Sequence, residues 1–149
     1  MSEYKKLVFS MVLFLSVPYI LGGCGPREPE VRHHTMEDVI AALENAGFEI
    51  LWRASQATDI MVSDEDTMAD VAEATRTQYG VEAYDRLAAG EDTMEVFIFD
   101  LSAPNAQANI ERAMEDAGPR RRLWRHDNIL YCIAGHPDAE AVRQAIEGL

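Results

Sequence analysis

Residues with ligand or nucleophile chemistry lie in two short stretches of the chain. His126, Cys132 and His136 carry imidazole and thiol groups, which are good ligands for zinc and copper. They form no paired Cys or His motif, so we interpret the histidines as turn residues and Cys132 as a small buried strand residue. His33 and His34 lie in a segment typical of a linker and would capture a metal only adventitiously. We therefore predict no metal site and no cofactor.

Acidic residues gather ahead of a predicted helix that begins near Thr67. Oxygen ligands of this kind suit Ca²⁺, but the segment lacks the alternating spacing and the glycine of a calcium loop. We interpret these acids as capping residues that stabilise the positive end of the helix. No nucleophile elbow, phosphate loop, metalloprotease motif or dinucleotide fingerprint is present, so we predict no catalytic residue. The acids in question are Asp59, Asp64, Glu65, Asp66 and Asp70.

A cluster of arginines forms a positive patch on a chain whose formal charge is −13. Its members are Arg120, Arg121, Arg122 and Arg125. Guanidinium groups bind carboxylates and phosphates well, so the patch is a candidate site for an anionic partner such as a lipid headgroup or a cell-wall polymer. The favoured alternative is pairing with carboxylates of the same chain. The strong overall negative charge argues against nucleic acid as a partner.

The N-terminal residues have the three parts of an export signal. Lys5 and Lys6 precede an uncharged apolar run, 7–21 (LVFSMVLFLSVPYIL), which ends in the tetrapeptide LGGC at 21–24. The run is shorter than the roughly 20 residues that a membrane-spanning helix needs, and Pro18 disfavours a continuous helix. A positively charged N-terminal region, a short apolar run and small residues before a cleavage site predict a signal peptide.

The tetrapeptide LGGC resembles the lipobox of bacterial lipoproteins, in which an aliphatic residue and two small residues precede a cysteine. The resemblance implies that the Cys24 thiol receives a diacylglyceryl group and that a peptidase cuts between Gly23 and Cys24. It covers only the first 24 residues. Because Gly25 and not aspartate follows the cysteine, the resemblance favours the outer membrane in a diderm bacterium. An uncleaved anchor helix and an ordinary secretory signal are the alternatives.

The rest of the chain reads as a linker and one domain. We predict a signal peptide over 1–23, then the lipidated cysteine and a flexible linker over 24–34 that is rich in Pro, Glu and Gly. Residues 35–149 form a single domain of ordinary size. Apolar residues at helical spacing predict helices over 35–46, 67–79, 81–89, 104–117 and 137–146. Alternating or continuous apolar runs predict strands over 48–53, 59–63, 94–101, 121–125 and 129–134.

These elements predict an α+β fold with one layer of helices on a sheet. Helices and strands are interleaved by short connections, which favours a two-layer sandwich: one sheet of four to five strands, with the helices mostly on one face. The apolar run 96–99 (VFIF) indicates a central strand that is covered on both faces or on most of them. The segment 42–53 (ALENAGFEILWR) also echoes 113–125 (AMEDAGPRRRLWR). This similarity indicates a degenerate duplication of a helix-strand-strand-helix unit, with chance recurrence as the alternative.

The sequence therefore predicts a lipoprotein of the bacterial cell envelope that acts as a non-catalytic binding or assembly module. Its partners would be the membrane, through the N-terminal lipid, and an envelope protein or an anionic ligand. The alternative is a small envelope enzyme or a metal-binding protein. A cleft that joins His126, His136 and a carboxylate would favour that alternative, whereas a flat apolar patch near the arginines would favour the binding module.

Overall fold

A computed structural model describes residues 30–133 and 135–149 of the chain. The predicted signal peptide, the cleavage point between Gly23 and Cys24, and the lipidation of Cys24 lie outside the described residues and stay predictions. Residues Val31 to Leu149 form one folding unit. None of the helices in the described ranges has the length and hydropathy to cross a membrane.

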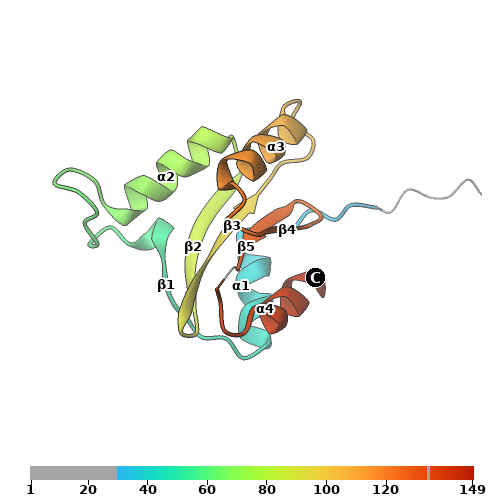
Figure 1. The fold of residues 1–149 in the computed structure, drawn as a ribbon, viewed down its shortest axis with the longest axis horizontal. Coiled ribbons are helices and arrows are strands. Elements are labelled where there is room, and N and C mark those ends of the chain that lie inside the picture. The colour runs from blue at the N-terminus through green and yellow to red at the C-terminus, as the bar shows by residue number, and fades with distance from the viewer. Residues whose placement is uncertain (1–29, 134) are drawn as a thin grey trace, which may run out of the picture. The chain divides into compact units, whose positions relative to one another are not determined.

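The described residues form four α-helices, a short 3₁₀ helix and one five-stranded sheet (Figure 1). The helices are α1 (Met36–Asn45), α2 (Met68–Tyr79), α3 (Ala106–Ala117) and α4 (Ala139–Glu147), and the 3₁₀ helix η1 spans Ala54–Gln56. The strands are β1 (Ile50–Arg53), β2 (Ala83–Ala89), β3 (Asp92–Ile98), β4 (Leu123–His126) and β5 (Ile129–Cys132). Their order in the sheet is β1-β2-β3-β5-β4, and every neighbouring pair is antiparallel. The predicted α+β class with a single sheet is confirmed.

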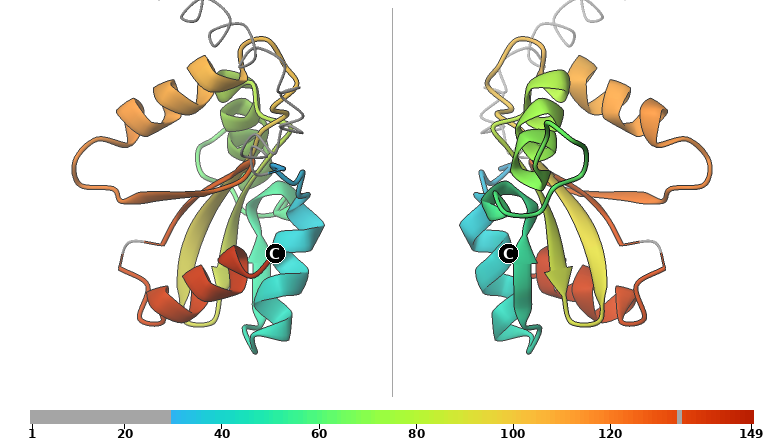
Figure 2. Two further views of the ribbon diagram at one scale, coloured as in Figure 1. Left: turned by 90° about the vertical axis from the view of Figure 1, so that its right-hand side faces the viewer. Right: turned by 90° about the vertical axis from the view of Figure 1, so that its left-hand side faces the viewer.

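Both faces of the sheet are buried beneath helices. Along β3, Val96 and Ile98 pack with α1 and α4, while Phe97 packs on the opposite face with α2 and α3. Figure 2 shows the sheet between these two pairs of helices. The predicted coverage of the run 96–99 on both faces is thus confirmed. We expected the helices mostly on one face of the sheet, but the helices that the structure describes are divided evenly between the two faces. The reason is that both faces are apolar: the neighbouring residues Leu130 and Tyr131 point to opposite faces, and both are buried.

Two of the predicted elements have another conformation. Residues 81–89 were expected to be helical but contain strand β2, which pairs with β3 from Ala83↔Ile98 to Ala89↔Asp92. Ala and Arg are strong helix formers, but intrinsic propensity is a small term, and the pairing of seven residues with β3 outweighs it. The expected strand 59–63 is reduced in the described chain to a single bridge between Met61 and Thr67.

Two threonines begin helices α1 and α2 as N-caps. The Thr67 side chain accepts a hydrogen bond from the backbone N–H of Asp70, whose carboxylate accepts from the Thr67 N–H and hydroxyl at 2.8 and 2.6 Å. Thr35 and Asp38 form the same capping box on α1. These hydrogen bonds hold the pKa of the Asp70 carboxyl below its ordinary value. The predicted capping role of the acids is confirmed for Asp70.

The two similar segments form α1–β1 and α3–β4, whose strands lie at opposite edges of the sheet. Trp52 packs on the face of α2 and α3, and Trp124 packs on the face of α1 and α4. In the described residues the second segment continues as strand-strand-helix, whereas the first lacks its second strand. Duplication therefore stays a hypothesis.

Candidate functional site

The predicted arginine patch is divided among several contacts. Arg121 forms an ion pair with Glu95, with 2.8 Å between its Nη1 and the carboxylate Oε2. The Arg122 guanidinium lies over the Trp124 ring, 5.9 Å from its centroid, and Arg125 donates to the Asp127 carbonyl at 3.1 Å. Among the described residues, Arg121 is the one member of the patch that pairs with a carboxylate. Self-pairing therefore accounts for only part of the cluster, and Arg120 stays exposed.

Arg121 lines a cleft between α2, α3 and the sheet, which we call the α2–α3 cleft. Glu95 on β3 accepts hydrogen bonds there from Tyr84 (2.9 Å) and Arg86 (3.1 Å), in addition to its pair with Arg121. Burial raises the pKa of the Tyr84 hydroxyl well above its ordinary value, and the adjacent Glu95 carboxylate raises it further. The Tyr84 phenol therefore stays protonated and can donate to Glu95 at neutral pH.

Aromatic rings form the walls of the same cleft. The Tyr84 and Phe97 rings are 4.9 Å apart, and Tyr79 meets Phe97 edge-on at 5.7 Å. The Tyr79 hydroxyl donates to Asp116 on α3 at 3.1 Å, which joins α2 to α3 across the cleft. The cleft thus combines cationic, anionic and aromatic side chains, which is the mixture that fixes the orientation of a bound ligand.

A second cluster of polar side chains lies where β4 turns into β5. One ligand atom each from His34, His126 and Asp127 lie within 4.8 Å of one another. The Asp127 Oδ2 is 3.1 Å from His34 Nε2 and 3.9 Å from His126 Nε2. The two imidazole rings stack at 5.7 Å with an interplanar angle of 26°. We call these three residues the histidine cluster.

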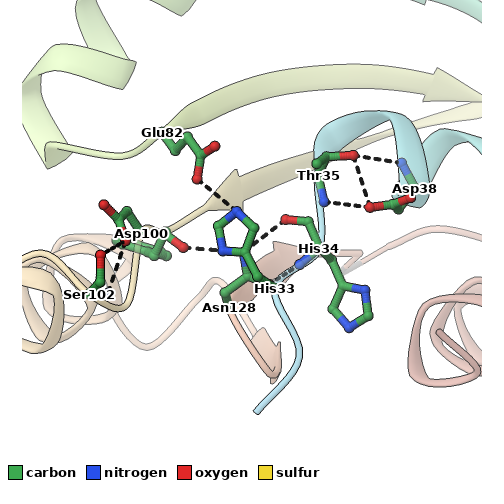
Figure 3. A network of polar contacts seen from close by, with 9 residues as sticks. His33, His34, Thr35, Asp38, Glu82, Asp100, Ser102 and Asn128 are labelled. Carbon is green, nitrogen blue, oxygen red and sulfur yellow. Dashed lines mark hydrogen bonds and ion pairs between the residues drawn. The ribbon is translucent and has the colours of Figure 1, made fainter.

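Asn128 fixes the backbone that carries the histidine cluster. Its side chain accepts a hydrogen bond from the His34 N–H (2.8 Å) and donates to the His34 carbonyl (2.9 Å) and to the Phe99 carbonyl (3.1 Å). Figure 3 shows the His33 ring between Glu82 and Asn128, with the His34 ring directed away from it. His33 Nε2 is 3.1 Å from the Glu82 carboxylate.

His33 and His34 therefore belong to the domain and not to the linker. The folding unit begins at Val31, and the His34 side chain is buried. The linker was expected to extend through His34 because the segment is polar and rich in Pro and Glu. The buried amide of Asn128 outweighs that composition, because it replaces the backbone hydrogen bonds that His34 would otherwise make with water.

The remaining candidates lie apart from this cluster. His136 is buried and its Nε2 is 2.7 Å from the Ala89 carbonyl, so it holds the chain after β5 against the end of β2. Cys132 is a buried free cysteine on β5, as predicted. The structure does not join His126 to His136 but joins it to His34 and Asp127. The sequence offered one clue, since Asp127 and Asn128 follow His126 in a predicted turn, but His34 lies 93 residues before Asp127.

Comparisons of the chain with protein-family models, curated proteins and solved structures find no match.

Proposed function

We propose that this protein is a lipid-anchored binding module of the bacterial cell envelope. The tetrapeptide LGGC at 21–24, behind a positive head and a short apolar run, supports the anchor. Each buried methylene of an acyl chain contributes about 0.8 kcal/mol, so two or three chains on Cys24 would hold the protein firmly. The seven residue-to-residue steps from Cys24 to Val31 reach at most about 25 Å, which would keep the domain close to the membrane surface.

The α2–α3 cleft carries the proposed binding role. Arg86 and Arg121, which line the cleft, are held by Glu95, and their directions are thereby fixed before any ligand arrives. Such preorganised groups bind at a lower entropic cost than free side chains. The Arg86 and Arg121 guanidinium groups would attract an anionic group, and the aromatic walls would contact its apolar part. The ligand class is therefore an envelope protein segment or another anionic envelope component.

Photo-crosslinking in living cells tests this proposal. A photoreactive amino acid replaces Gln78, which lines the cleft, in the anchored protein and in the Cys24→Ser variant. We expect a light-dependent adduct in the anchored protein and a much weaker one in the unanchored variant. The same group at the exposed Glu111, on the part of α3 away from the cleft, is the control. Equal adducts at Gln78 and Glu111, or none at either, would contradict a binding role for the cleft.

A metal-binding function is the second candidate, and the histidine cluster favours it.

A further inference from the structure

We propose that His34, His126 and Asp127 bind a divalent transition metal ion of the Zn²⁺ class. Two imidazoles and one carboxylate are the donor set that proteins use for Zn²⁺ and for neighbouring first-row ions. The site is independent of the proposed lipid anchor and of the α2–α3 cleft. Three protein ligands leave one coordination position open, which a water molecule or an exogenous anion would fill.

The distances in the histidine cluster fit one shared ion. Bonds of about 2.0–2.2 Å to a tetrahedral Zn²⁺ place its ligand atoms about 3.4 Å apart. The two separations from Asp127 Oδ2, 3.1 Å to His34 Nε2 and 3.9 Å to His126 Nε2, lie on either side of this value. All three ligand atoms lie within 4.8 Å of one another, so binding one ion would require the side chains to draw closer together.

An unpartnered buried nitrogen points to the same site. His126 Nε2 is buried and has no hydrogen-bond partner among the described residues, although a carboxylate lies 3.9 Å away. Buried polar atoms are almost always satisfied, and one that is not calls for a partner that is absent from the protein itself. A bound ion would accept the lone pair of this nitrogen and, in the same position, the lone pairs of His34 and Asp127.

The surrounding backbone holds the three ligands in place. His126 and Asp127 are fixed by the turn between β4 and β5, where His126 pairs with Ile129. Asp127 has φ 49°, a left-handed conformation that Asp and Asn adopt more readily than other non-glycine residues. The Asn128 amide fixes His34 through both of its backbone groups.

A zinc titration of the full chain tests the site. The protein is prepared without an affinity tag, in detergent, and with Cys24→Ser throughout, because a free thiol would itself bind zinc. After chelator treatment, calorimetry with ZnCl₂ measures the stoichiometry and affinity. We expect one Zn²⁺ per chain, and a rise of the thermal midpoint because the ion binds the folded state.

Three variants separate this site from other donors. His126→Phe keeps an aromatic ring beside His34 and removes the two ring nitrogens, of which the buried Nε2 makes no hydrogen bond within the described residues, so it should fold normally. Asp127→Asn keeps a residue that tolerates the left-handed turn. Both should weaken zinc binding at least tenfold, whereas His33→Phe, next to the cluster but outside it, should bind like the parent. Absence of zinc binding by the parent, or unchanged binding by His126→Phe, would overturn the proposal.

Discussion

Replacing Asn128 with alanine removes the side chain that attaches the first folded residues to the sheet. Asn128 is 1% exposed, and its amide makes three hydrogen bonds to backbone groups: two to His34 and one to Phe99. Alanine can make none of these. The His34 N–H, the His34 carbonyl and the Phe99 carbonyl would lose these partners, and His34 would lose the contacts that place its ring beside Asp127.

The expected cost follows from those three hydrogen bonds. Each contributes about 0.5–1.5 kcal/mol net, and a buried group left without a partner costs toward the upper end of that range or beyond it. The free energy of unfolding should therefore fall by about 2–4 kcal/mol. For a domain of this size, the thermal midpoint should fall by roughly 10 °C.

Urea unfolding followed by circular dichroism measures this difference. Asn105→Ala is the matched control, since Asn105 precedes α3, is exposed and makes no side-chain hydrogen bond to the helix it caps. Its effect should stay within about 0.5 kcal/mol. Hydrogen exchange adds a local readout, because the His34 amide should lose its protection in Asn128→Ala. Equal stability of Asn128→Ala and Asn105→Ala would refute the attachment that we assign to Asn128.

Three further predictions concern the packing of the sheet and its helices. Arg53→Met should lower the free energy of unfolding by about 3–5 kcal/mol, because it removes the guanidinium group that pairs at 2.8 Å with the fully buried carboxylate of Asp85. Denaturant unfolding measures this loss, and a value below about 1 kcal/mol would contradict the prediction. Asp70→Asn should reduce the loss of stability on acidification, because hydrogen bonds with Thr67 lower the pKa of the Asp70 carboxyl in the folded state. The stabilisation by the Asp70 carboxylate is present above the unfolded-state pKa near 3.8 and is lost as the pH falls through the folded-state pKa. Urea midpoints at several pH values test this, and an unchanged acid slope would contradict it. Gly80→Ala should lower the free energy of unfolding by about 1 kcal/mol or more, since Gly80 ends α2 with φ 58°; stability equal to the parent would show that this conformation is not required.

The sequence predicted correctly those elements in which buried residues recur at one regular spacing along the chain. Helix α1 was predictable because Val39 and Leu43 are buried at helical spacing after a Thr35 cap. Strand β2 was not, because Tyr84, Asp85, Leu87 and Ala88 are all buried between two layers of helices, and a strand buried on both faces has no alternating pattern.

The candidate sites were less predictable than the fold, because they join residues that are distant in sequence. The arginine cluster marked Arg121, but its partner Glu95 looked like any other acid in an acidic chain. His34 was assigned to the linker, and its contact with Asp127 depends on a side-chain clamp by Asn128 that no periodicity reveals. Sequence patterns report local conformation, whereas both sites are products of tertiary packing.

Lipid anchoring at Cys24 is tested most directly by the intact mass of the protein recovered from the membrane fraction of cells that express the wild type or Cys24→Ser. Anchoring predicts a wild-type mass that lacks residues 1–23 and carries added acyl chains, and it predicts that the substitution abolishes both changes. A full-length, unmodified wild-type chain in the membrane fraction would contradict it and would assign the apolar run to an uncleaved anchor.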